Sequence, residues 1–145
     1  MPRGRADLTQ GSVLHIVGFA SRGHPAKNKY LLVLGACTET EVLAFLISSR
    51  LHYLQMDPHK REVVRIPHNA TSFLLTESLI QCFELERLAV GSLEEGFEQG
   101  RVTHAGRLPV KYLHRVRDAV ATSFLLPQVD IDLVLKLLPA PSSSG

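Results

Sequence analysis

Four apolar segments in the first half of the chain have the length and composition of β-strands. Residues 12–19 (SVLHIVGF) are rich in β-forming side chains and predict a first strand. Residues 29–35 are a nearly continuous apolar run closed by a glycine, which predicts a second strand covered on both faces. Residues 41–49 (EVLAFLISS) predict a third strand, although their Leu and Ala content also suits a short helix. Residues 62–66 (EVVRI) end before a proline and predict a fourth strand.

Polar segments with glycine or proline connect these strands. Residues 20–28 predict a long hairpin loop, and residues 57–60 predict a turn. Residues 71–88 mix strand and helix periods, which predicts short strands around a turn at Thr76-Glu77. Residues 97–108 are punctuated by glycines, which predicts a loop with a short strand. The chain up to residue 108 is therefore expected to be mainly β.

Helical periodicity appears only after this point. Pro109 suits a first helical position, and apolar residues then recur at steps of three and four: Val110, Leu113, Val116, Val120 and Phe124. This pattern predicts an amphipathic helix packed on the sheet. Residues 129–138 (VDIDLVLKLL) predict a second, shorter helix. Strands first and helices last predict a mainly β fold with appended helices, as a compact antiparallel sheet or barrel.

Length and composition predict how the chain is organised. The 145 residues are enough for one domain with its own core, which we expect at 11–138, between a flexible basic leader at 1–10 and a disordered tail at 139–145. No apolar run approaches the roughly 18 residues that a membrane-spanning helix needs. Cys37 and Cys82 have no metal-binding or redox spacing, which indicates reduced, buried thiols and a cytoplasmic protein.

Charge is distributed unevenly, although the net charge is only +2. Basic residues are concentrated in the first thirty positions: Arg3, Arg5, Arg22, Lys27 and Lys29. Acidic residues are concentrated later in the chain: Glu84, Glu86, Glu94, Glu95 and Glu98. A basic face opposite an acidic face suits a protein that binds a polyanion, and solvated charge without a partner is the other interpretation.

Several classes of chemistry lack their motifs in this sequence. The seven histidines are scattered, with neither the helical His-Glu pairing of zinc proteases nor the Cys/His spacing of a structural zinc site. The glycine motifs of serine hydrolases, nucleotide-binding loops and dinucleotide-binding folds do not occur. The sequence therefore predicts neither a metal nor a cofactor.

Two polar groups remain as candidates for chemistry. The first is a set of cations before and at the start of the second strand: Arg22, Lys27 and Lys29. The second is the motif ISSR at residues 47–50. If the second and third strands pair in antiparallel fashion, Lys29 lies near Ser48, or near Ser49 if the register differs by one residue. A cation beside a hydroxyl suits a phosphodiester, whereas the alternative is a solvated strand end with a satisfied hydroxyl.

The order and spacing of these segments resemble the MazF/PemK family of toxins from bacterial toxin–antitoxin modules. The matching segments cover most of the core: GSVLHIVGF, KNKYLLVLG, AFLISS, TESLIQCFELERL and GRLPVKYLHRVRDAV. Three positions depart from the family pattern. Ser12 replaces an acidic residue, Lys29 replaces an Arg, and Tyr30 replaces a Pro. The resemblance implies an SH3-like barrel with helices, of the MazF/PemK/CcdB type.

The resemblance also implies a function and partners. It implies a metal-independent endoribonuclease that cleaves single-stranded RNA, needs no cofactor, forms a homodimer and is held by a cognate antitoxin protein. The catalytic positions fall on Lys29 and on Ser48 or Ser49. The residues expected to contact RNA are Arg22, His24, Lys27 and Arg50. Lys29 keeps the positive charge of the family Arg but lacks its planar, bidentate fork, which bears directly on catalysis.

Three alternatives accompany this interpretation. One is a member of the same fold that binds RNA or protein without cleaving RNA. Another is a toxin that grips a protein target, as the related CcdB branch grips gyrase, with the function on the C-terminal helix at 129–138. The third is an unrelated small barrel without a role in nucleic-acid binding.

Overall fold

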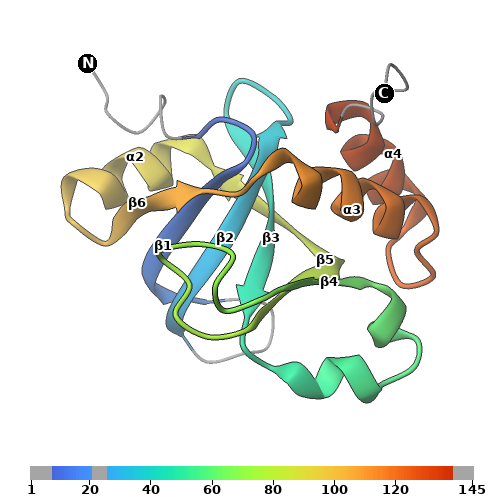
Figure 1. Ribbon diagram of the computed structural model, residues 1–145. Helices are drawn as coiled ribbons and strands as arrows, with labels where there is room; N and C mark the ends of the chain where they lie inside the picture. Colours follow the sequence, from blue (N-terminus) through green and yellow to red (C-terminus); the bar gives the residue numbers. More distant parts are fainter. Residues whose placement is uncertain (1–7, 21–25, 139–145) are drawn as a thin grey trace.

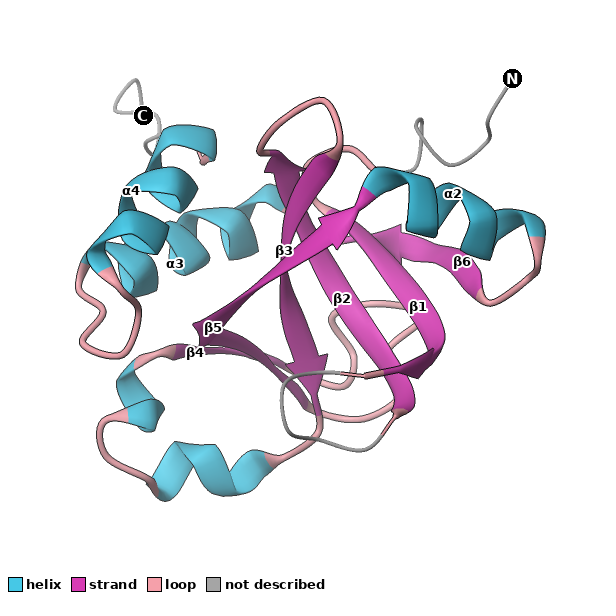
Figure 2. Cartoon of the chain, turned by 180° about the vertical axis from the view of Figure 1, so that it is seen from behind, coloured by secondary structure: helices cyan, strands magenta, loops and turns pink. Residues whose placement is uncertain are grey.

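An antiparallel β-sheet forms the centre of the computed structural model, which describes residues 8–20 and 26–138 (Figure 1). Within these residues the sheet has six strands in the order β4-β5-β3-β2-β1-β6. The strands are β1 (Ser12–Phe19), β2 (Lys27–Ala36), β3 (Glu41–Ser48), β4 (Val63–Ile66), β5 (Ser78–Ala89) and β6 (Val102–Arg107). The described helices are α2 (Val90–Glu98), α3 (Val110–Ala121) and α4 (Gln128–Leu137). The prediction of a mainly β fold with appended helices is confirmed. Among the described strands the sheet is twisted but not closed, with β4 and β6 at its edges (Figure 2).

The two central strands are buried on both faces, as the apolar run in β2 predicts. Side chains alternate between the faces of a strand, so neighbouring residues of β2 enter two different cores. Leu32 and Leu34 belong to the larger core, which α3 and α4 complete. Leu31 and Val33 belong to the smaller core, which α2 completes. The segment predicted at 41–49 forms a strand, β3, rather than a helix, because it pairs with β2 on one side and β5 on the other; the strand ends one residue early, at Ser48.

Helix α3 packs on the sheet through a shorter apolar stripe than the sequence predicts. Its buried residues are Tyr112, Leu113, Val116 and Val120. The prediction is wrong at both ends of the stripe, because Val110 is 59% exposed and Phe124 is 76% exposed. Val110 is the first residue of the helix, and Phe124 lies beyond its end at Ala121.

The helices of the described residues are too short or too polar to span a membrane.

Two segments differ from the sequence-based expectation. Residues 71–88 do not form short strands around a turn at Thr76-Glu77. Instead β5 is one twelve-residue strand, which pairs with β3 at both of its ends and with β4 at its first residues, Ser78 to Gln81. Helix α2 was not predicted at all, since its two glycines and nine residues give a weak periodic signal. It is stabilised by tertiary packing, through the burial of Val90 and Leu93 in the smaller core.

The segment between β3 and β4 contains more structure than the single predicted turn. It forms two short 3₁₀ turns, η1 (Leu51–Gln55) and η2 (His59–Arg61). Tyr53 and His59 stack with ring centroids 5.5 Å apart, and both contact Phe83 of β5. These ring contacts hold the segment against the sheet.

The packed core begins earlier than the predicted leader allows. Leu8 is buried in the smaller core. The side chain of Gln10 donates hydrogen bonds to the carbonyls of Leu34 and Leu137, both at 2.9 Å. Residues 8–10 therefore belong to the folded core. The rest of the expected leader, 1–7, and the expected tail, 139–145, lie outside the described residues.

A buried carboxylate fixes the connection between α3 and α4. Glu62 is only 1% exposed and lies just before β4. Its carboxylate accepts hydrogen bonds from the Ser123 hydroxyl and from the backbone N–H groups of Phe124 (3.0 Å) and Leu125 (3.1 Å). Burial, and secondly the charge of Glu62, raise the pKa of the Cys82 thiol. Cys82 and Cys37 are both free.

Replacement of Glu62 by Ala should destabilise the protein by about 2–4 kcal/mol, because it leaves several donors of the α3–α4 connection without their charged acceptor. Glu62→Gln should cost less, since one carbonyl oxygen remains. Urea denaturation would measure both effects. The matched control is Glu98→Ala, at an exposed position of α2, which should change stability by no more than about 0.5 kcal/mol. Equal stability of the Glu62→Ala and Glu98→Ala variants would show that the connection does not depend on this carboxylate.

Candidate functional site

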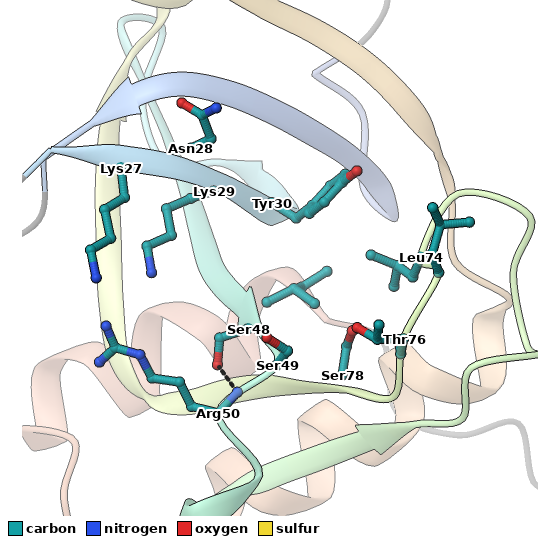
Figure 3. Close-up of a pocket in the computed structure, with 12 residues that line it drawn as sticks. Lys27, Asn28, Lys29, Tyr30, Ser48, Ser49, Arg50, Leu74, Thr76 and Ser78 are labelled. Atoms are coloured by element: carbon teal, nitrogen blue, oxygen red, sulfur yellow. Dashed lines mark hydrogen bonds between the residues drawn. The ribbon is translucent and has the colours of Figure 1, made fainter.

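A pocket opens where β2 begins and β3 ends (Figure 3). We call it the β2–β3 pocket, and its volume is about 290 Å³. It is lined by Lys27, Asn28, Lys29, Tyr30, Ile47, Ser48, Ser49, Arg50, Leu74, Leu75, Thr76 and Ser78. Five of the seven residues that the sequence analysis selects for the site are in this set: Lys27, Lys29, Ser48, Ser49 and Arg50. The other two, Arg22 and His24, lie outside the described residues.

Antiparallel pairing of β2 with β3 places the cations opposite the hydroxyls. Tyr30 is the register partner of Ile47. Because antiparallel strands run in opposite directions, the preceding residue, Lys29, faces the following residue, Ser48. The other side of β3 pairs with β5, where Ser48 is the partner of Leu79. The end of β3 is thus held between two strands, and the geometry expected from the hairpin argument is present.

Three cations are concentrated at one end of the pocket. Figure 3 shows the side chains of Lys27 and Lys29 descending from β2 toward the guanidinium group of Arg50. We call these three residues the pocket cations. Desolvation by burial lowers the pKa of Lys29 below its ordinary value, and repulsion by Arg50 and then by Lys27 lowers it further. None of the described residues that line the pocket is Asp or Glu. The pocket cations therefore lack a carboxylate partner within this lining.

Hydroxyl groups occupy the floor and the opposite end of the pocket. Ser48 is buried, and its Oγ accepts a hydrogen bond from the backbone N–H of Arg50 at 3.4 Å. A hydroxyl group that accepts a hydrogen bond can also donate its own proton to a second partner. Ser49 is exposed, so both predicted serines line the pocket, with Ser48 the more firmly enclosed. The Ser78 hydroxyl donates to the carbonyl of Thr76 at 3.0 Å.

Sequence reasoning missed the wall of the pocket that precedes β5. This wall consists of Leu74, Leu75 and Thr76 before β5 and of Ser78, its first residue. The predicted turn at Thr76-Glu77 located a loop here, but no local pattern relates it to Lys29. The two segments meet because β5 pairs beside β3, which is a long-range contact.

The arrangement favours a bound anion. Cations with no carboxylate among the described residues of the pocket lining, in the same pocket as a buried hydroxyl, can provide both charge and directional hydrogen bonding to a phosphate group. No group of three or more His, Cys, Asp or Glu side chains that could hold a metal ion occurs within residues 8–20 and 26–138.

Comparison with protein-family models finds no match, and comparison with curated proteins finds none either. The resemblance to the MazF/PemK toxins therefore remains a prediction based on the order of the segments.

The electrostatic coupling between Arg50 and Lys29 can be tested directly by substitution. Replacement of Arg50 by Gln should raise the pKa of Lys29, because loss of a neighbouring positive charge favours the protonated ammonium form. A pH titration of the lysine Cε and Nζ resonances by NMR would measure this change. The control is Arg61→Gln, at an exposed arginine of η2 that does not line the pocket. If the two variants shift the Lys29 titration equally, the pocket cations are not specifically coupled.

Proposed function

We propose that the protein binds single-stranded RNA in the β2–β3 pocket and cleaves it as an endoribonuclease of the MazF/PemK type. The observation that carries the proposal is the clustering of the three pocket cations in the same pocket as the buried hydroxyl of Ser48, with no Asp or Glu among the described lining residues. A phosphodiester supplies the negative charge and the acceptor oxygens that these groups lack. We further propose that the curved sheet is an opened form of the SH3-like barrel of that family, acting in the cytoplasm as a homodimer under the control of an antitoxin protein.

In the proposed reaction, the bond that forms and the bond that breaks both lie within the RNA, and one proton is transferred. The ribose 2′-oxygen loses its proton and attacks the adjacent phosphorus, and the bond to the 5′-oxygen breaks. The products are a 2′,3′-cyclic phosphate and a 5′-hydroxyl, which takes up a proton. Lys29 stabilises the negative charge that develops on the phosphoryl oxygens, and Ser48 orients the phosphate by hydrogen bonding. Because the 2′-hydroxyl is the nucleophile, DNA would bind without being cleaved.

A second candidate function is RNA binding without cleavage. One observation favours it: none of the described residues that line the pocket is His, Asp or Glu, the side chains that most often act as general bases. A cleavage assay separates the two candidates.

Incubation with mixed-sequence single-stranded RNA in the presence of EDTA should yield fragments with cyclic phosphate ends. Lys29→Ala should lower the cleavage rate by roughly 10²–10³-fold, since it removes one electrostatic contact to the transition state. Lys29→Arg should retain or raise the rate, because a guanidinium group can hold two phosphoryl oxygens at once. Ser48→Ala should be nearly as damaging as Lys29→Ala, and the double variant little worse than either, because the two residues act on one group.

The outcomes of this assay are distinct. If the wild type cleaves RNA and Lys29→Ala cleaves it equally well, the reaction takes place elsewhere. If only Lys29→Arg cleaves, the chain is a silenced member of the fold. A thermal melt of each variant would show that a lost rate is not a lost fold.

The salt dependence of RNA binding tests the pocket cations independently of cleavage. The probe is a 2′-O-methyl RNA, which has no free 2′-hydroxyl. Lys27→Ala should reduce the slope of log affinity against log salt by about 0.7, because one phosphate contact fewer releases fewer counterions. The matched control is Lys136→Ala on α4, outside the pocket lining, which should leave the slope unchanged. An equal slope for wild type and Lys27→Ala would mean that Lys27 is merely solvated.

A further inference from the structure

The β2–β3 pocket has two chemically different ends. The pocket cations lie at one end. At the other end, the aromatic ring of Tyr30 extends toward Leu74 and the residues that follow it (Figure 3). The neighbouring Leu75, which is 86% exposed, and the buried Ile47 also line the pocket. A phosphate alone would use the cationic end and leave without a function the other end, where the Tyr30 ring and the leucines lie beside the hydroxyls of Thr76 and Ser78.

The Tyr30 ring is held in position by the neighbouring strand. His15 of β1 is its direct register partner, and the two ring centroids lie 4.8 Å apart. Tyr30 also packs against the larger core. Its aromatic surface is therefore presented to the pocket at a fixed place, next to Lys29 on the same strand. This is the position at which the family resemblance expects a Pro, so the ring is a feature of this chain.

The opposite wall is anchored at several points. Leu74 is buried in the larger core, and the Thr71 hydroxyl accepts a hydrogen bond from its backbone N–H at 3.1 Å. The ring of Phe73 packs directly over Gly106 of β6, where a Cβ atom would overlap it. The guanidinium group of Arg65 contacts the carboxylate of Glu77 at 2.6 Å. Between these anchored neighbours Leu75 lines the pocket and is 86% exposed.

We propose that the end of the β2–β3 pocket between Tyr30 and Leu75 is a subsite for a nucleobase of the RNA whose phosphate the pocket cations bind. The base stacks on the Tyr30 ring, and Leu75 covers its edge or other face. The occupant follows from charge complementarity in the same pocket, because the ligand must carry a phosphate and an apolar planar group side by side. Bases of single-stranded RNA are splayed out and stack on aromatic side chains in this way. The inference rests on the proposed function and adds the part of the nucleotide that is recognised.

Two probes separate base binding from phosphate binding. One is a short 2′-O-methyl RNA, and the other is an abasic 2′-O-methyl ribose-phosphate strand of equal length and charge. The folded wild-type protein should bind the base-bearing strand more tightly at fixed salt, measured by fluorescence anisotropy. Tyr30→Ala should weaken binding of the base-bearing strand by roughly 5- to 100-fold, which is the range measured for loss of a stacking side chain. It should leave binding of the abasic strand unchanged.

Because Tyr30 is half-buried, Tyr30→Ala could weaken binding through a folding defect, and two further variants test for this. Leu75→Ser changes an exposed side chain and should also weaken only the base-bearing strand. Phe124→Ser is the matched control, since it removes an exposed apolar residue outside the pocket and should affect neither probe. A 2-aminopurine base in the probe should lose emission on binding to the wild type and keep it with Tyr30→Ala.

Each result decides the question. If Tyr30→Ala and Leu75→Ser both weaken binding of the base-bearing strand and leave binding of the abasic strand unchanged, the nucleobase subsite is supported. If the wild type binds both strands equally, phosphate binding stands and the subsite is overturned. If the wild type prefers the base-bearing strand but neither variant reduces the preference, the base lies elsewhere and the subsite is again overturned. If neither strand binds, the proposed function fails and the subsite fails with it.

Discussion

The antiparallel pairing of β2 with β3 is the constraint on which the rest of the structure depends. The pairing of Tyr30 with Ile47 fixes which residues of the two strands meet at their polar ends. The same register directs alternate β2 side chains into the two cores, so a shift by one residue would exchange the faces of every side chain. Burial of the leucines at 31, 32 and 34 therefore also fixes the place of Lys29. The apolar core and the candidate site are determined by one set of hydrogen bonds.

Concentration of like charges at the pocket opposes folding, and the surrounding structure has to compensate for it. The pKa of Lys29 is lowered accordingly, since burial and repulsion both disfavour its charged form. No Asp or Glu among the described lining residues relieves the repulsion. Binding of an anion would relieve it, because the charges that repel one another would then share a counter-charge. Strained electrostatics of this kind are more frequent at functional sites than on inert surfaces.

The pocket also combines segments from three distant parts of the chain. Two of the pocket cations, Lys27 and Lys29, come from β2, and the third, Arg50, follows the end of β3. Most of the opposite wall comes from the loop before β5. That wall is fixed by Phe73 on Gly106 and by Arg65 with Glu77, and neither contact is local in sequence. The proposed division into a phosphate end and a base end follows from these two origins. A rigid strand presents the charges, and an anchored loop presents the apolar cover.

The sequence by itself determined the strand-rich first part, the two C-terminal helices and the nearness of Lys29 to Ser48. Each of these follows from local periodicity or from the hairpin geometry of adjacent strands, both of which are written in consecutive residues. Tertiary structure alone decided the single long strand β5, because it forms by pairing with β3 and β4 against a mixed local pattern. It also decided helix α2, whose stability comes from burial of Val90 and Leu93. The wall at Leu74 and Leu75 and the carboxylate anchor at Glu62 belong to the same category, since long-range contacts carry no local periodic signal.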